Sequence, residues 1–318
     1  MRSEFDFIQN LKSKYGLEKI GDDCSVLPKD RLNDQIITAD MLVEEVDFRL
    51  EWTTAEFLGH KALAVSLSDI AAMGGGPKWA LLSIGIPRSL WKTDFIDKFY
   101  DGWQALAQRH GVELVGGDLS KTPDKVVIDS IVSGEVPKGK AILRSGARPG
   151  DSIYVTGELG GAAGALILLE ADLSHDQSNE KYIELTSRQL RPTPQLDVGK
   201  QLLDLGLATS MIDISDGLSS DLSHICNASG VGAIIYSDKI PIDRNLSKLS
   251  LNAEQRLGLA LNGGEDFELL FTADEKAMSQ ANLRGITLIG KLTSDTGLIK
   301  IINAEGTSFL PPDGFRHF

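Results

Sequence analysis

The chain contains very few cysteines. Of its 318 residues only Cys24 and Cys226 are cysteines, and they lie far apart with no zinc-type spacing. The composition therefore indicates neither a disulfide framework nor a cysteine-ligated metal site. A reducing, cytoplasmic compartment fits this composition.

Positive charge is also scarce. The chain has 32 lysines and arginines against 45 acidic residues, which gives a formal net charge of −13. Because no broad basic surface can displace phosphate counterions, we expect neither a nucleic acid nor an anionic membrane as a partner. An anionic substrate would therefore need metal ions or a few well-placed arginines.

Long apolar runs and common nucleotide motifs are missing. The longest apolar run, Ala162 to Leu169, is too short to span a bilayer, and the first residues lack an apolar export core. We therefore expect a protein that is neither secreted nor membrane-embedded. The chain has neither a Gly-x-x-x-x-Gly-Lys-Ser/Thr loop nor a kinase-type His-Arg-Asp loop, so any nucleotide must be held in another way. Its five histidines show no ligand spacing, and none is expected to be catalytic.

Length and pattern predict two mixed domains. A chain of 318 residues is about twice a typical domain. Strand and helix patterns alternate in both halves without a repeat of 20 to 50 residues, which predicts an α/β or α+β fold. The segment 137–151 is rich in Gly, Lys and Arg, and it divides the chain into residues 1–138 and 139–318.

Local patterns place several acids next to predicted elements. Residues 35–38 predict a short buried strand with Asp40 at its exit, and Thr53 with Glu56 predicts a capping box that starts a helix. That helix carries Asp69 in its last turns. Residues 112–115 predict a strand from which Asp118 departs after two glycines.

Carboxylates at element ends are the most informative feature that the chain does have. They occur in four short runs and one isolated position: Gly21-Asp22-Asp23, Thr38-Ala39-Asp40, Gly116-Gly117-Asp118, Asp213-Ile214-Ser215-Asp216-Gly217, and Asp69. A single aspartate at such a place usually caps a helix or closes a turn. Gathered acids repel one another unless a cation lies among them, and hard oxygen donors favour Mg²⁺. Five such positions together indicate phosphate chemistry that uses metal ions.

Two further segments are candidates for substrate contact. Arg144 lies in the predicted interdomain segment, and its planar guanidinium suits phosphate oxygens, although simple solvent exposure is an equal alternative. Gly263-Gly264-Glu265-Asp266-Phe267-Glu268 sets three acids around a predicted strand start, where ligands often bind. Cys24 has no neighbouring base in sequence and is expected to be a small buried residue.

These segments together resemble one known family. The resemblance runs through eight ordered blocks that span nearly the whole chain: Gly21–Cys24, Thr38–Val43, Lys61–Gly74, Gly116–Asp118, Arg144–Asp151, Asp213–Leu218, Gly263–Leu269 and Gly314–Phe318. A Gly-Asp-Asp or Gly-Gly-Asp triplet alone would be weak, but the ordered set resembles the thiamine-monophosphate kinases of the aminoimidazole-ribonucleotide-synthetase superfamily.

The resemblance implies an activity and an architecture. It implies ATP-dependent phosphorylation of thiamine monophosphate to thiamine diphosphate with several Mg²⁺ ions. It also implies a homodimer in which the amino-terminal domains pair into a barrel-like sheet, while an α+β carboxy-terminal domain completes the substrate cleft. An acceptor that is already a phosphate needs no strong base, so we expect direct in-line transfer that depends on positioning and charge neutralisation.

The resemblance also assigns residues. The implied metal positions are Asp23, Thr38, Asp40, Asp69, Asp118, Asp213, Asp216 and the carbonyl of Ala39. The implied nucleotide positions are Gly117, Asp118, Arg144 and Ser215, and the implied thiamine positions are Asp47, Glu265 and Phe315. Asp40, Asp118 and Arg144 are the expected catalytic residues. The family usually places histidine in the segment 45–48, so Asp47 departs from the pattern by reversing the charge possible there.

Two other readings stay open at the level of sequence. A sister enzyme of the superfamily would share the metal-binding acids and pair them with different substrate segments. A non-enzymatic scaffold would bind Mg-ATP without consuming it.

Overall fold

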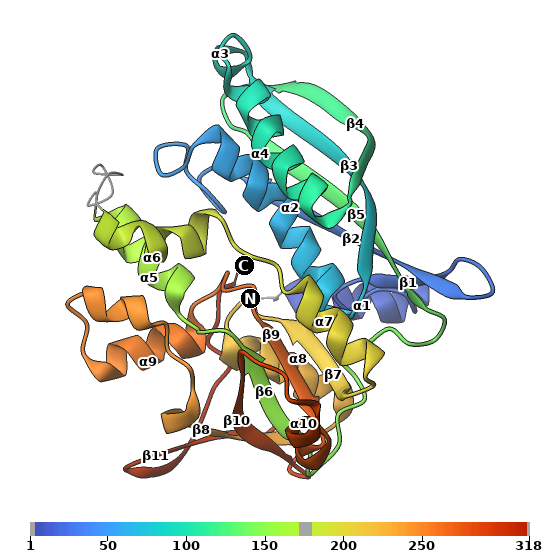
Figure 1. Cartoon of the computed structure of the whole chain (residues 1–318), viewed down its shortest axis with the longest axis vertical. Coiled ribbons are helices and arrows are strands. Elements are labelled where there is room, and N and C mark those ends of the chain that lie inside the picture. Colours follow the sequence, from blue (N-terminus) through green and yellow to red (C-terminus); the bar gives the residue numbers. More distant parts are fainter. Residues whose placement is uncertain (1–3, 172–179, 317–318) are drawn as a thin grey trace.

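The chain folds into two β-sheets flanked by helices (Figure 1). This computed structural model describes residues 4–171 and 180–316, and it shows the mixed α/β fold that the sequence predicts. The first sheet has the strand order β1-β2-β5-β3-β4 and the second has the order β12-β11-β8-β10-β6-β9-β7. Among the described strands neither sheet closes into a barrel.

The first sheet and its helices come from the amino-terminal half. The elements are α1 (Glu4–Tyr15), β1 (Ser25–Pro28), β2 (Asn33–Val43), α2 (Ala55–Ala72), β3 (Gly76–Pro87), α3 (Arg88–Trp91), α4 (Phe95–His110), β4 (Glu113–Thr122) and β5 (Val127–Pro137).

The second sheet and its helices come from the carboxy-terminal half. The elements are β6 (Ser152–Thr156), α5 (Gly161–Glu170), α6 (Glu180–Leu190), α7 (Leu196–Asp204), β7 (Ala208–Asp213), α8 (Leu218–Ser229), β8 (Gly232–Tyr236), η1 (Ser237–Lys239), η2 (Arg244–Lys248), α9 (Ala253–Asn262), β9 (Leu269–Ala273), α10 (Glu275–Ala281), β10 (Ile286–Thr293), β11 (Ile299–Asn303) and β12 (Gly306–Phe309). The predicted division at 138/139 falls in the connection between β5 and β6, and it stays a prediction.

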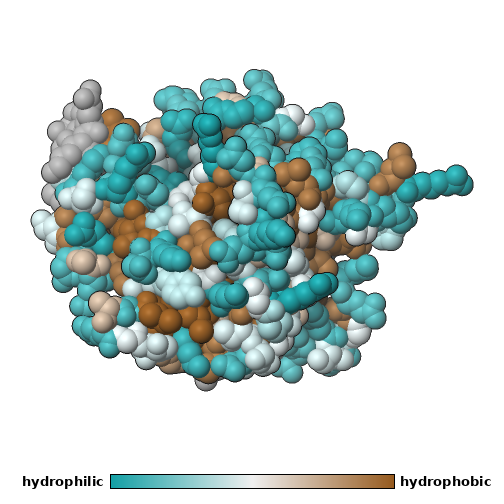
Figure 2. Space-filling model, turned by 60° about the horizontal axis from the view of Figure 1, so that its bottom comes forward, coloured by the Kyte–Doolittle hydropathy of each residue, from teal (hydrophilic) through white to brown (hydrophobic). Residues whose placement is uncertain are grey.

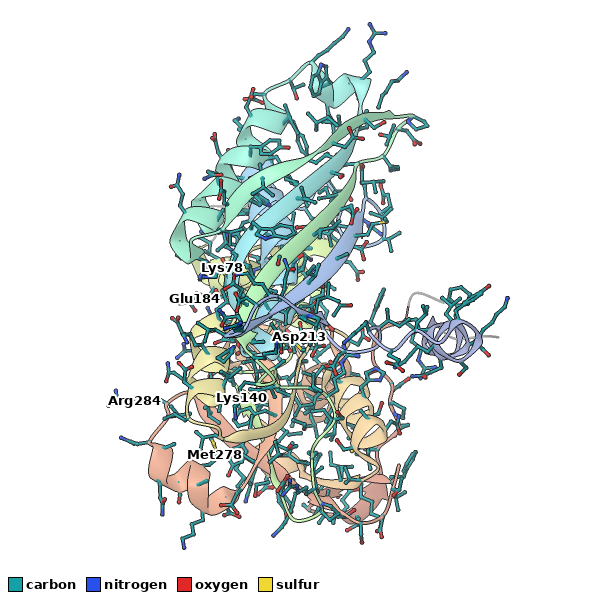
Figure 3. All side chains as sticks on the ribbon, turned by 90° about the vertical axis from the view of Figure 1, so that its right-hand side faces the viewer. Lys78, Lys140, Glu184, Asp213, Met278 and Arg284 are labelled. Atoms are coloured by element: carbon teal, nitrogen blue, oxygen red, sulfur yellow. The ribbon has the colours of Figure 1, made fainter. Side chains whose placement is uncertain are left out.

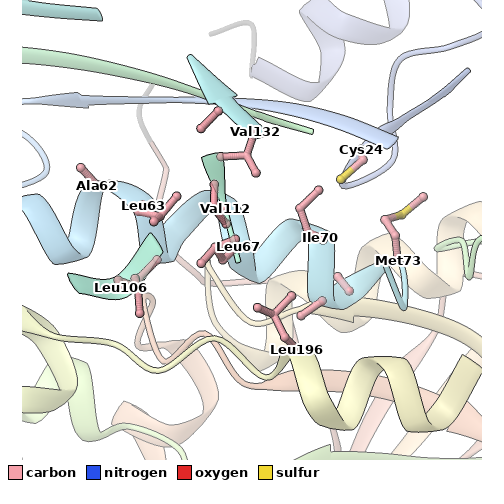
Figure 4. Packing of buried hydrophobic residues seen from close by; sticks show 14 of the residues in the cluster. Cys24, Ala62, Leu63, Leu67, Ile70, Met73, Leu106, Val112, Val132 and Leu196 are labelled. Atoms are coloured by element: carbon pink, nitrogen blue, oxygen red, sulfur yellow. The ribbon is translucent and has the colours of Figure 1, made fainter. Parts of the chain in front are cut away.

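Helix α2 is the central helix of the molecule. Leu63, Leu67 and Ile70 are fully buried between the first sheet, helix α4 and, near its end, helix α7 (Figure 4). A helix that is apolar on nearly every side is typical of a core position. Asp69 belongs to this helix, so its position is fixed by packing on several sides.

Close backbone contact holds α2 against α4. A Cβ on Gly102 would lie 1.8 Å from the carbonyl oxygen of Glu56, and a Cβ on Gly59 would lie 1.9 Å from that of Phe99. Only glycine permits this approach, because side chains at these positions would force the helices apart.

Three local predictions need correction. The cap of α2 is Thr54 and not Thr53, because the Thr54 hydroxyl accepts the hydrogen bond from the backbone N–H of Phe57. Asp40 lies inside β2, and Asp118 lies inside β4, whereas the sequence predicted both just beyond shorter strands. Pairing with β5 extends β2 beyond its short apolar run, and pairing with β3 does the same for β4. The sequence prediction ends both strands where those apolar runs end.

The two sheets meet around the end of β7. Asp213, labelled in Figure 3, is the last residue of that strand and lies where the halves of the molecule join. The second half has its own core, built around residues such as Ile153, Leu222 and Leu270. Asp213 at the end of β7 lies next to the helix α2 of the first half.

The outer surface shown in Figure 2 is mainly hydrophilic, with hydrophobic residues in separate patches. No described helix combines the length and the apolar character needed to cross a membrane.

Candidate active site

Three of the predicted metal-binding acids converge. Carboxylate oxygens of Asp23, Asp69 and Asp213 all lie within 4.8 Å of one another. Asp23 precedes β1, Asp69 belongs to α2, and Asp213 ends β7, so the cluster joins elements far apart in sequence. Asp23 and Asp213 are buried and Asp69 is half-buried.

Hydroxyl groups connect Asp40 to this cluster. The Thr38 hydroxyl donates to a carboxylate oxygen of Asp69 and, at 3.5 Å, to Asp40. Ser66 donates to Asp40 at 2.7 Å, and Ser68 donates to Asp213 at 2.6 Å. The sequence did not single out either serine, and only their place next to Asp69 on α2 could have indicated them.

Burial makes the charged form of these acids costly. It raises the pKa of Asp40 to about 6 and that of Asp213 to about 7, and nearby carboxylates add to both effects. The pKa of Asp69 is also raised, first by burial and then by the charge of Asp40. A bound cation would offset this cost, and the set of carboxylate and hydroxyl oxygens fits Mg²⁺.

Arg144 is bound to the edge of the cluster. Its Nε donates to Asp23 Oδ1 at 3.0 Å and a terminal nitrogen donates to the same oxygen, while its backbone N–H donates to Asp22 Oδ1 at 3.1 Å. The other oxygen of Asp23 is buried and has no hydrogen-bond partner among the described groups. The guanidinium therefore orients Asp23, and an oxygen of that carboxylate is left for a further ligand.

Asp118 and Gly117 lie away from the cluster of their own chain. Four residues on neighbouring strands pair in one row across the first sheet: Asp40, Ser130, Leu82 and Gly117. At the usual spacing between strands, the backbones of Asp40 and Gly117 are therefore about 14 Å apart. Asp118 is exposed and pairs with Ser83, whose side chain faces away from α2. A Cβ on Gly117 would lie 1.8 Å from the carbonyl oxygen of Leu82, so this position requires glycine.

A cavity of about 470 Å³ opens beside the acids, between the two halves of the molecule. Asp40, Ser215 and Asp216 lie on its wall, and so do the predicted thiamine positions Asp47, Glu265 and Phe315. The apolar part of the wall includes Trp52 and Phe267. The structure thus brings all three predicted thiamine positions to one cavity.

The predicted thiamine positions differ in their local roles. An oxygen of Asp47 accepts a hydrogen bond of 2.8 Å from the backbone N–H of Val43, which closes the turn after β2. Phe315 is anchored through its backbone N–H, which donates to Asp216 O at 2.9 Å. Glu265 pairs with Lys61 on α2, whose Nζ lies 2.7 Å from its Oε1.

The other two acids of the 263–268 segment are structural. Asp266 is buried and accepts hydrogen bonds from the backbone N–H groups of Gly160 and Ala162, at 2.6 and 3.1 Å. Glu268 is buried and accepts from Thr156 and Arg188. Only Glu265 of these three acids lines the cavity.

The remaining predicted positions are also placed. Asp216 lies close to Asp221 and His224, with ligand atoms within 4.8 Å of one another. Ala39 lies on β2 between Thr38 and Asp40 with its side chain exposed, so only its carbonyl could take part in the site.

Comparison with known proteins defines the class first. Residues 21–136 match the family described as "AIR synthase related protein, N-terminal domain", and residues 148–302 match "AIR synthase related protein, C-terminal domain". The two matches together cover most of the chain, which therefore belongs to the AIR synthase related proteins.

Individual relatives identify the family within this class. The chain is 38% identical over 306 residues to thiamine-monophosphate kinase of Bacillus subtilis, covering 94% of this chain and 93% of that one. It is 40% identical over 309 residues to thiamine-monophosphate kinase of Escherichia coli K12, covering 94% and 91%. A solved structure, AaThiL complexed with AMPPCP and TMP, matches with a TM-score of 0.88 at 32% identity, covering 99% and 97%. The chain therefore belongs to the thiamine-monophosphate kinase family.

Proposed function

We propose that this protein transfers the terminal phosphoryl group of ATP to thiamine monophosphate, giving thiamine diphosphate and ADP. The observation that carries the proposal is the convergence of Asp23, Asp69 and Asp213 beside a cavity lined by Glu265 and Phe315. The relative AaThiL, which has the same fold, was solved with AMPPCP and TMP. That relative supports both substrates of the proposed reaction.

The proposed metal-binding residues are those of the acid cluster together with Asp40 and Asp216 of the same chain, and Asp118 of a partner chain. Mg²⁺ bound there would offset the negative charge that the two phosphate substrates bring together. The chain itself supplies orientation: Arg144 holds Asp23, Ser66 holds Asp40, and Ser68 holds Asp213. None of these groups needs to act as a strong base, because the acceptor phosphate is already ionised near neutral pH.

The charge of the cavity wall supports a cationic acceptor. Six acidic and two basic side chains line it, and its aromatic residues include Trp52. A positively charged heterocycle fits this combination, since acids and aromatic faces both attract cations. Asp47, at a position where histidine is usual, adds to the negative charge rather than opposing it.

We also propose that the protein acts as a homodimer, in which the first sheets of two chains pair. The outward positions of this sheet include Ile37, Leu81 and Ile131, which are apolar and only half-buried. Gly117 and Asp118 lie at the exposed edge of the same sheet. A partner chain is therefore the proposed source of the Asp118 that completes each site. ATP dependence leads us to place the reaction in the cytoplasm.

The test is a direct assay of the purified protein. Incubation with Mg-ATP and thiamine monophosphate should give equal amounts of thiamine diphosphate and ADP, separated by chromatography. No covalently phosphorylated protein should accumulate with labelled ATP. A scaffold would bind Mg-ATP without forming either product, and a sister enzyme would leave thiamine monophosphate unchanged.

A further inference from the structure

Three elements meet at the carboxylate of Glu265. Lys61 comes from α2, Gln189 comes from the last turn of α6, and Glu265 belongs to the loop before β9. Lys61 Nζ lies 2.7 Å from Oε1 of Glu265, and the Gln189 amide donates from Nε2 to Oε2. Both oxygens of Glu265 are thus held, and all three residues line the cavity.

Burying Lys61 and Gln189, the two residues that hold Glu265, lowers the stability of the fold. Lys61 is 3% exposed and Gln189 is 4% exposed, so a charge and an amide are both withdrawn from water. Because a carboxylate only accepts hydrogen bonds, the Gln189 amide must turn its nitrogen to Glu265. Its oxygen is then left buried without a partner among the described groups. Such an orphaned acceptor lowers stability, because its hydrogen bonds to water are lost and not replaced.

The backbone around Glu265 is strained. Glu265 has φ 65° and Phe267 has φ 50°, in the left-handed region that residues with a Cβ avoid. Strain of this kind is unfavourable and persists only where surrounding contacts impose it. Here the N–H groups of Glu265 and Phe267 donate to the carbonyls of Ser215 and Ile214 at 2.8 and 2.9 Å. The strained loop turns Glu265 into the cavity while Asp266 points into the core.

Helix α2 connects this carboxylate to the acid cluster. Lys61, Val65 and Asp69 follow one another at intervals of four residues and so share one side of the helix. Eight residues of helix rise by about 12 Å. The cavity wall includes both Asp40, beside the cluster, and Glu265. One substrate can therefore place a phosphate at the cluster and a heterocycle at Glu265.

We propose that Lys61 and Gln189 are positioning residues that hold the Glu265 carboxylate as the recognition point for the positively charged heterocycle of the phosphate acceptor. This inference rests on the proposed function, which supplies thiamine monophosphate as that acceptor. The unpaired oxygen of Gln189 and the strained backbone at Glu265 then lower stability, and they serve acceptor binding rather than folding.

The test compares Glu265→Gln, Lys61→Met and Gln189→Leu with the wild type. Lys200→Met is the matched control, because Lys200 is exposed and forms an ion pair with Asp204 on its own helix, away from the cavity. We expect each of the three variants to raise the KM for thiamine monophosphate about tenfold or more, as loss of a charge-assisted contact does. The KM for ATP should stay within about twofold of the wild type, and Lys200→Met should change neither constant.

Two further measurements separate positioning from simple structural support. Gln189→Leu should keep or raise the melting temperature while it weakens acceptor binding, because it removes the orphaned oxygen. The double variant Lys61→Met, Glu265→Gln should have a KM for thiamine monophosphate no higher than that of the more impaired single variant. The reason is that the two residues act as one unit. An unchanged KM for thiamine monophosphate in Lys61→Met and Gln189→Leu, with only a lower melting temperature, would overturn the proposal.

Calorimetric titration with thiamine monophosphate keeps this inference distinct from the proposed function. If the wild type binds thiamine monophosphate without phosphorylating it, only the proposed function fails, and the dissociation constants of the variants test the positioning. A wild type that neither binds nor phosphorylates this compound overturns both.

Discussion

Ser68 of α2 donates a hydrogen bond of 2.6 Å to Asp213 at the end of β7, so a residue of the first half holds an acid of the second. Its neighbour Asp69 is the acid that α2 itself contributes to the cluster. One buried helix therefore sets the position of both carboxylates. The geometry of the site depends on how the two halves pack. Substitutions in the cluster should therefore change both turnover and the stability of the protein.

Asp69→Asn should separate these two effects. It removes a charge that burial and Asp40 destabilise, so the melting temperature without metal should rise. Turnover should fall on the order of 10² or more, because a main electrostatic stabiliser is lost. Thermal melts with and without Mg²⁺, together with an ADP-release assay, measure both effects.

The control for this variant is Asp101→Asn, at an exposed position on α4. It should leave turnover and the Mg²⁺-dependent rise in melting temperature unchanged. In Asp69→Asn that rise should shrink, since a ligand that binds only the native state stabilises it by an amount that grows with the logarithm of the ratio of ligand concentration to Kd. Wild-type turnover with a full Mg²⁺ effect would rule out the metal-binding role of Asp69.

Asp118 should act across the proposed dimer. Asp118→Ala and Asp69→Asn should each be inactive alone, because every site then lacks one acid. In a mixed dimer one site carries both changes and the other carries neither, if Asp118 comes from the partner. Random mixing of the two chains should therefore restore up to about a quarter of wild-type activity. Co-expression with two different purification tags and an activity assay test this, and no recovery would show that Asp118 and Asp69 of one and the same chain serve one site.

The sequence predicted the convergence of Asp23, Asp69 and Asp213 because each lies where a short local pattern can be recognised. The face of Asp118 could not be predicted in this way. The pairing of β3 with β4 shifts register between Ala80 and Leu81, where Val115 is the extra residue. Since side chains alternate along a strand, that one residue moves Asp118 to the side opposite α2.

The walls of the cavity were harder still to predict. Lys61 and Gln189 lie 128 residues apart in sequence and meet only because α2 and α6 pack on the same loop. No spacing rule connects them with Glu265. The three acids of residues 265–268 looked equivalent in sequence, whereas the strained backbone turns one outward and two inward.

Arg144→Met should weaken both folding and metal binding. It leaves Asp23 buried without its main partner, and breaking a buried ion pair in this way typically costs about 3–5 kcal/mol. The side chain of Arg144 is 19% exposed, so we expect the lower end of that range. Urea unfolding measures the loss. Saturating Mg²⁺ should recover part of it if Asp23 is a metal ligand, and an equal loss with and without Mg²⁺ would argue against that role.

Asp266 gives a pH dependence that can be isolated from the metal site. Burial raises its pKa from 3.8 to about 6, although the N–H groups of Gly160 and Ala162 and the charge of Arg188 act in the opposite direction. The native state therefore holds this proton more tightly than the unfolded chain does. Its contribution to stability is fully present below pH 4 and is lost as the pH rises towards 6.

The comparison that tests this is wild type against Asp266→Asn, unfolded by urea at several pH values between 4 and 7. A shift of about two pKa units corresponds to about 3 kcal/mol in total, and the free energy of unfolding of the wild type should fall by most of that amount, roughly 2 kcal/mol, relative to Asp266→Asn between pH 4 and 6.5. Above that range the difference should be constant. Because Asp101→Asn removes an exposed carboxylate, its difference from the wild type should stay nearly flat throughout. A flat difference for Asp266→Asn as well would mean that the cap on α5 stays charged in the native state, with its two backbone hydrogen bonds outweighing its burial.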